Sequence, residues 1–273
     1  MSYSLLSRFR GALIGSWVSE GLAFPDVSAR TKEGFCADAI ATSAESLIST
    51  RSISSTAAQI TRLDQHRALA SIIPIALYGH DNPQALEPII ADTTPTALQG
   101  AALVIANSIT AALAHRSPFN PLPALIQHVT DESLSQPLQQ VERLLSCRGS
   151  LAIALQTLGD PEQIEVAVVL ALYCWLSTPA QFQLSVLRAH RIPNVSPLTL
   201  SLTGAFSGAF NGQAAMPLPW LQSTAASGGK IESMEKRADQ LLAIWSGCYP
   251  SELGTVNEME AVAVSAPGLL HPR

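Results

Sequence analysis

The polar residues that could form a site fall in three separate segments of the chain. Glu20 could act as a general acid or a ligand-binding carboxylate, or it could be a hydrogen-bonded charge at a helix end. The hydroxyl run at residues 54–56 could hold a phosphate or sugar at a helix N-terminus, or it could simply cap the helix that follows. We take as the candidate ligand-binding set Glu20, Ser54, Ser55, Thr56, Asn194 and Ser196, with Glu20 the one candidate remnant catalytic acid.

The spacing of cysteines, histidines and glycines excludes several common kinds of site. The four cysteines are widely scattered without a CxxC pair, and the six histidines form no HxH or HxxxH pair, so a zinc site is not expected. No dinucleotide fingerprint, P-loop or nucleophile elbow occurs. A small basic cluster around His190, with Arg188 and Arg191, could meet an acidic partner or a phosphate, or could be a solvated helix end.

The elements that must position these residues are predicted to be helices. Apolar residues recur at helical spacing, and no stretch of five residues alternates as a strand would. Asp160 and Pro161 are typical of a helix start, and Pro74 should kink or restart its helix. The expected helices cover residues 5–22, 56–78, 95–115, 122–129, 134–145, 161–176, 179–190, 199–211 and 231–245.

Two of these helices carry small residues at every fourth position. Side chains at i, i+4 and i+8 share one helix face, so small ones let a neighbouring backbone approach closely. We therefore expect a tight helix crossing at the positions Gly11, Gly15, Ser19, Gly204, Gly208 and Gly212.

Composition narrows the class of protein further. Only 14% of the 273 residues are charged, the net charge is −5 and 47% are hydrophobic, which argues against a disordered chain and against a nucleic-acid partner. The longest apolar run, residues 166–176, is too short to span a bilayer, and residues 100–114 read as a buried helix, so no membrane span is expected.

Unpaired cysteines predict a cytoplasmic location for the protein. Its low content of charged residues suggests a surface that is covered by a protein partner.

Three segments in register carry a resemblance to a known family. Residues 8–15 read RFRGALIG and residues 202–212 read LTGAFSGAFNG, followed by Met216-Pro217 and Trp220-Leu221. A helix pattern at residues 165–189 lies between them. Together they resemble the ADP-ribosylglycohydrolase family, which includes the dinitrogenase reductase-activating glycohydrolase. The resemblance implies an all-α fold, a compact multi-helix orthogonal bundle. We expect one such domain over residues 1–248 and a mobile tail over 249–273, where prolines and glycines punctuate the chain.

The sequence departs from the family where the resemblance places its metal ligands. Family enzymes hold two magnesium ions, chiefly through a T-D-D-T motif and a G-G-D-T-D-T motif. Counted in register, these fall at residues 53–56 and 193–198, and four of their aspartates are replaced by Ser54, Ser55, Val195 and Pro197. Glu20 stands at the acid of the opening helix. Magnesium prefers carboxylate oxygens, so we expect no magnesium ions and no other cofactor.

These departures predict a catalytically inactive relative that acts as a binding, regulatory or scaffold protein. A protein partner of unidentified kind is expected, and an ADP-ribose or nucleotide ligand is the second kind left open. The alternative is an active hydrolase of ADP-ribosylated or other glycosidic substrates with a non-standard site. That alternative needs a second acid near Glu20.

Overall fold

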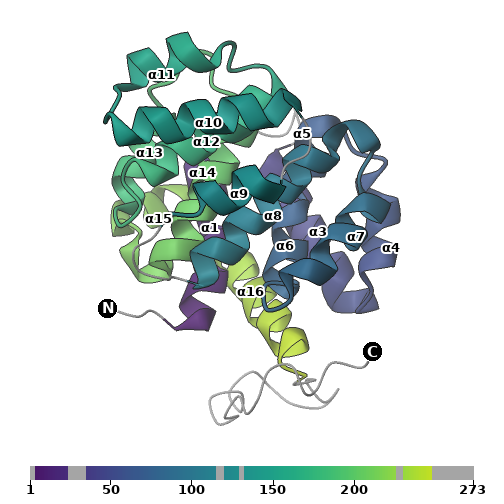
Figure 1. The fold of residues 1–273 in the computed structure, drawn as a ribbon. Coiled ribbons are helices and arrows are strands. Elements are labelled where there is room, and N and C mark those ends of the chain that lie inside the picture. Colours follow the sequence, from purple (N-terminus) through teal and green to yellow (C-terminus); the bar gives the residue numbers. More distant parts are fainter. Residues whose placement is uncertain (1–3, 24–34, 115–119, 129–131, 226–229, 248–273) are drawn as a thin grey trace.

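In the computed structural model, the described residues are 4–23, 35–114, 120–128, 132–225 and 230–247. Within them every regular element is a helix, which confirms the all-α prediction (Figure 1). The expected tail and the residues around Asp131 lie outside this part of the chain. The helices not discussed individually below are α7 (Pro83–Thr93), α9 (Leu122–His128), α10 (Glu132–Ser146), α11 (Leu151–Leu158), α15 (Leu218–Ala225) and the short 3₁₀ turns Thr96–Leu98 and Gln213–Ala215.

The bundle is built on the crossing of α1 (Leu5–Ala23) and α14 (Pro197–Asn211). Gly11 faces Gly208 and Gly15 faces Gly204, so the two helices run in opposite directions. A Cβ atom added at Gly11 or Gly208 would collide with the carbonyl oxygen of its partner glycine. The backbones therefore touch directly, as the spacing of small residues predicted.

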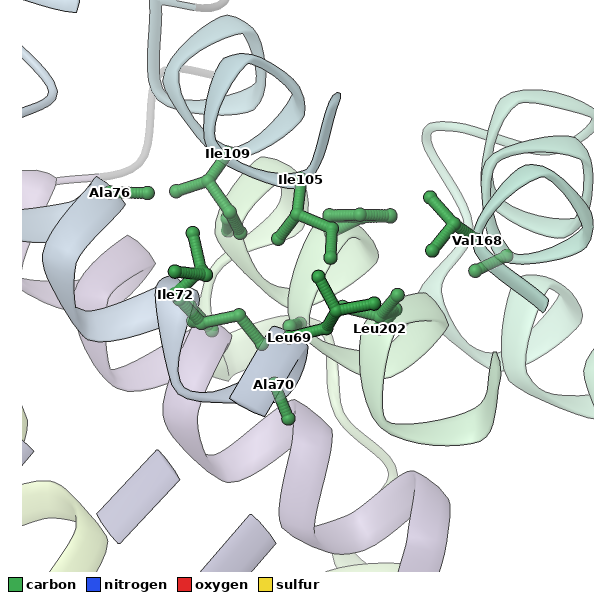
Figure 2. Packing of buried hydrophobic residues seen from close by; sticks show 14 of the residues in the cluster. Leu69, Ala70, Ile72, Ala76, Ile105, Ile109, Val168 and Leu202 are labelled. Carbon is green, nitrogen blue, oxygen red and sulfur yellow. The ribbon is translucent and has the colours of Figure 1, made fainter. Parts of the chain in front are cut away.

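Other helices surround this crossing and complete the core. α3 (Cys36–Thr50) and α16 (Lys230–Trp245) pack against α1, while α12 (Ile164–Leu176) and α13 (Phe182–Ala189) pack against α14. α5 (Gln65–Ala70), α6 (Ile72–Tyr78) and α8 (Gln99–Ala114) close the remaining side. Figure 2 shows the apolar side chains that meet there, including Leu69, Ile72, Ile105, Val168 and Leu202.

The predicted helix at residues 56–78 is divided into three helices. α4 (Ile53–Ile60) ends before Asp64, whose side chain accepts from the backbone N of Arg67 at 3.1 Å and starts α5. α6 begins after Ser71, and Pro74 sits in its first turn, where its missing N–H costs nothing. The restart that Pro74 predicted is present, but the capping residue Asp64 adds a second break.

The predicted start of the helix at residues 161–176 is wrong. α12 begins at Ile164 with Gln163 as its N-cap, and the residues between Asp160 and Gln163 form a turn. Asp160 accepts from the backbone N of Glu162 at 3.0 Å, so its side chain closes this turn instead of capping the helix. Asp favours both arrangements, which is why the local pattern alone did not separate them.

One helical segment passes a length and hydropathy test for a membrane span. Residues Thr96–Ala114 have a mean hydropathy of 1.6 over the test window, of which 56% is buried against the rest of the protein. Core helices pass the same test, and α8 packs on α6 and α14. These contacts fit the core-helix interpretation made from the sequence.

The glycine crossing makes a testable prediction about stability. Gly208→Ala should lower the free energy of unfolding by about 1–3 kcal/mol because the new Cβ overlaps a backbone carbonyl that cannot rotate away. On helix propensity alone the same change should instead stabilise by about 1 kcal/mol. Urea unfolding followed by circular dichroism measures the sign. Gly79→Ala is the control, since its Cβ would overlap only the side chain of Leu86, which can shift, and would make an ordinary contact with the carbonyl oxygen of Ile75. A Gly208→Ala protein as stable as the parent would contradict the described crossing.

Candidate functional site

The carboxylate of Glu20 caps the N-terminus of α3. Glu20 is 1% exposed; its Oε1 accepts from the backbone N of Cys36 at 3.0 Å and its Oε2 from that of Ala37 at 2.9 Å. The first N–H groups of a helix have no partner within the helix, and the positive end of the helix dipole favours an anion there. The preceding residue, Phe35, has no side-chain group that could do this. Glu20 thus ties the end of α1 to the start of α3.

This cap shapes the chemistry of the neighbouring thiol. Burial raises the pKa of Cys36 well above its ordinary value, and the negative charge of Glu20 raises it further. The thiol therefore stays protonated at neutral pH. A protonated buried thiol is neither a strong nucleophile nor a magnesium ligand.

The start of α14 lies beside the same end of α1. Because α1 and α14 cross in opposite directions with Gly15 against Gly204, the last turn of α1 meets the first turn of α14. His190 reinforces this junction through its Nε2, which lies 2.8 Å from the carbonyl oxygen of Ser19. Burial lowers the pKa of His190, so the neutral ring donates this hydrogen bond.

The predicted residues at this helix start have local roles. Ser196 is the N-cap of α14, and its Oγ accepts from the backbone N of Leu198 at 3.2 Å. Asn194 is exposed and holds a left-handed backbone conformation with φ of 50°. Val195 packs partly buried against the core, and Pro197 occupies the first turn. No carboxylate occurs among residues 193–198.

The third predicted segment lies elsewhere. Thr56 is buried on α4, and its Oγ1 donates to Ser46 Oγ at 3.1 Å, near the C-terminal end of α3. Ser46 is ten residues after Cys36, which corresponds to about 15 Å along a helix. Ser55 is exposed, and the side chain of Ser54 is outside the described part. The structure therefore brings Glu20 together with the start of α14, but places residues 54–56 apart from both.

The N–H groups of Cys36 and Ala37, at the start of α3, bind Glu20 instead. No helix was predicted at α3, although its buried positions Cys36, Ile40, Ala44 and Leu47 follow helical spacing. Its many Ala, Ser and Thr residues weaken this signal, and its capping residue lies in another helix. Counting residues in register with the family placed its first metal motif at residues 53–56. In the structure these residues do not lie beside Glu20.

A small hollow opens beside the capping carboxylate. Trp17, Glu20, Gly21 and Phe35 line about 170 Å³, open solvent included. Lys230 lies nearby, with its Nζ 5.2 Å from the centroid of the Trp17 ring and 3.0 Å from Asp38 Oδ1.

The donor atoms around Glu20 do not fit a pair of magnesium ions. Two divalent ions need several hard oxygen ligands, and the described neighbours offer one carboxylate that already accepts two N–H groups. Over the described ranges, no group of three or more His, Cys, Asp or Glu residues could hold a metal. The acids of α3 form ion pairs with α16 instead: Asp38 with Lys230 and Glu45 with Arg237, both at 3.0 Å.

Comparison with known proteins agrees with this fold and these helix junctions. The family model for ADP-ribosylglycohydrolase matches residues 29–250, and the chain belongs to this family. Among solved structures, one described as an ADP-ribosylglycohydrolase-related protein complex is similar, with a TM-score of 0.59 and 16% identity. The match covers 86% of this chain and 97% of that chain, so the two share a fold. No curated protein sequence matches the chain.

Glu20→Gln tests whether the carboxylate is a structural cap. The amide keeps one acceptor but turns a donor toward a backbone N–H, so the variant should lose about 1–3 kcal/mol of unfolding free energy. Urea unfolding measures the loss. Glu232→Gln, an exposed acid in the first turn of α16, is the matched control and should change stability little. Equal stability of the two variants would contradict the capping role.

Two half-buried histidines, His80 and His190, predict a loss of stability in mild acid. Burial lowers the pKa values of His80, which packs between Phe9 and Trp245, and of His190 below the ordinary 6.5. Below about pH 6.5 the unfolded chain therefore binds protons that the folded chain does not, and stability falls until the folded pKa values are passed. His190→Gln keeps a donor for Ser19 but cannot titrate, so its unfolding free energy should fall less steeply with acid. An identical slope in urea titrations across this pH range would rule out His190 as a contributor.

Proposed function

We propose that this member of the ADP-ribosylglycohydrolase family binds a partner and does not carry out magnesium-dependent hydrolysis. The observation that supports this most is the environment of Glu20. Its two carboxylate oxygens accept from the backbone N–H groups of Cys36 and Ala37 at the start of α3, and neither of these residues supplies a hard anionic ligand.

The second helix junction supports the same conclusion. At the start of α14, Ser196 uses its hydroxyl oxygen as a cap, and Val195 is drawn against the core. Pro197 and Val195 have no side-chain oxygen. Two magnesium ions carry four positive charges, and one carboxylate cannot balance them in a partly buried site. Activation of water and orientation of ribose hydroxyls by metal would then have no agent.

The alternative, a hydrolase with a non-standard site, requires a second carboxylate beside Glu20. On α3 the acids are Asp38 and Glu45, and both pair with cations of α16. This pairing favours the binding function over the alternative.

The surface supports a protein as the partner. Four large apolar side chains are well exposed: Ile153 on α11 at 50%, Leu184 and Leu187 on α13 at 44% and 38%, and Leu218 on α15 at 70%. Leu184 and Leu187 share one face of α13. With only 14% of the residues charged, these exposed apolar side chains are where we expect a protein partner to dock. We place it in the cytoplasm, where its free cysteines would stay reduced.

A hydrolysis assay tests the proposal directly. The full chain is incubated with an ADP-ribosyl-arginine peptide and magnesium, beside an active enzyme of the family, and release of ADP-ribose is measured. We expect no release above the protein-free blank. Calorimetric titration with ADP-ribose runs in parallel, and binding without turnover would support a ligand-sensing form of the proposed function.

One result of the same assay would overturn the proposal. Saturable, magnesium-dependent release that disappears in Glu20→Gln and persists in Glu232→Gln would overturn the proposal and favour the hydrolase. Circular dichroism of both variants separates loss of chemistry from loss of the α3 cap.

A further inference from the structure

A second hollow lies between α3, α4 and α5. It encloses about 310 Å³, open solvent included. These three helices lie together on one side of the bundle (Figure 1). Ile60 and Leu63 contribute apolar wall. We call this the α3–α5 hollow, and its polar lining consists of Thr42, Ser43, Thr56, Gln59, Arg67 and Ser71.

Arg67 carries the unused hydrogen-bonding capacity of the hollow. Its Nε is buried and has no hydrogen-bond partner. Its Nη1 lies 3.8 Å from Asp64 Oδ2, too far for a hydrogen bond, while Asp64 Oδ1 is engaged by the backbone N of Arg67. The guanidinium is always charged, and its Nε–Nη2 edge presents two parallel donors. Such an edge fits one oxyanion group, with Nη1 left to Asp64.

The hydroxyl groups of the lining complement this donor pair. Ser43 donates to the carbonyl of Ser71 at 2.9 Å, and Ser71 donates to the carbonyl of Arg67 at 2.8 Å. Thr56 likewise donates to Ser46. Because each of these hydroxyl groups already donates its proton to another group of the protein, its oxygen can only accept a hydrogen bond from a ligand. The lining therefore offers donors at Arg67 and acceptors opposite it.

We propose that the α3–α5 hollow binds a small oxyanion that also carries a hydroxyl group. The Nε and Nη2 of Arg67 take the carboxylate or phosphate, and the hydroxyl oxygens of Thr56 and Ser43 accept from the ligand hydroxyl. The apolar wall at Ile60 and Leu63 covers its carbon atoms. This hollow is separate from the one beside Glu20, because the two linings share no residue. The proposal stands whether or not the chain hydrolyses ADP-ribose.

Calorimetric titration of the full chain with four probes tests the site. Malate and succinate are dicarboxylates with and without a hydroxyl group, and glycerol 3-phosphate and propyl phosphate are phosphate monoesters with and without hydroxyl groups on carbon. We expect the hydroxyl-bearing member of one pair to bind most tightly, and the pair that binds identifies the oxyanion. Arg67→Gln should weaken that binding at least tenfold. Arg67→Lys should restore only part of the affinity, because an ammonium group cannot donate two parallel hydrogen bonds to one oxyanion. Arg143→Gln, an exposed arginine on α10, removes the same charge elsewhere and should bind within twofold of the parent.

A measurement on the unmutated protein shows binding at Arg67 without relying on a variant that could fail to fold. The Nε–H resonance of Arg67, assigned through the Arg67→Lys spectrum, should shift on titration with the bound probe. Saturable binding with this shift, lost in Arg67→Gln and kept in Arg143→Gln, would support the site. Binding that is equal in Arg67→Gln and Arg143→Gln, an unmoved Nε–H resonance, or no binding of any of the four probes would overturn it.

Discussion

Direct contact between the backbones of α1 and α14 is the constraint on which the rest of the structure depends. Gly11 and Gly15 meet Gly208 and Gly204 so closely that no Cβ fits between the helices. Close approach maximises dispersion contact and fixes how far one helix can slide along the other. The opposed directions then bring the end of α1 to the start of α14. The functional region of the fold is thus a consequence of how its core packs.

Glu20 extends this constraint to a third helix. Its carboxylate uses the unpaired N–H groups of Cys36 and Ala37, so α3 begins at a place defined by α1. In the binding function that we propose, the carboxylate of Glu20 completes the helix that begins at Cys36.

The resemblance read from three segments was sufficient for the fold. The glycines spaced by four predicted the close crossing of α1 and α14, while the family membership rests on the match over residues 29–250. Helix boundaries were harder to predict from the sequence where a polar side chain could either close a turn or cap a helix. Asp160 closes a turn and Asp64 caps a helix, although both are acids before a helical pattern. Which of the two roles the carboxylate takes depends on which nearby backbone N–H group has no other acceptor once the helices have packed.

By itself, the sequence determined the helical class, the α1–α14 crossing and the absence of acids at residues 193–198. Only the tertiary structure decided what lies opposite Glu20. Counting residues suggested the hydroxyl run at 54–56, but the loop lengths between helices are not fixed by any local pattern. The distance between Thr56 and Cys36 is set by where α4 lands on α3, and that depends on long-range packing. For the same reason, the hollow around Arg67 has no signature in the sequence: its lining comes from three helices that become neighbours only when the chain folds.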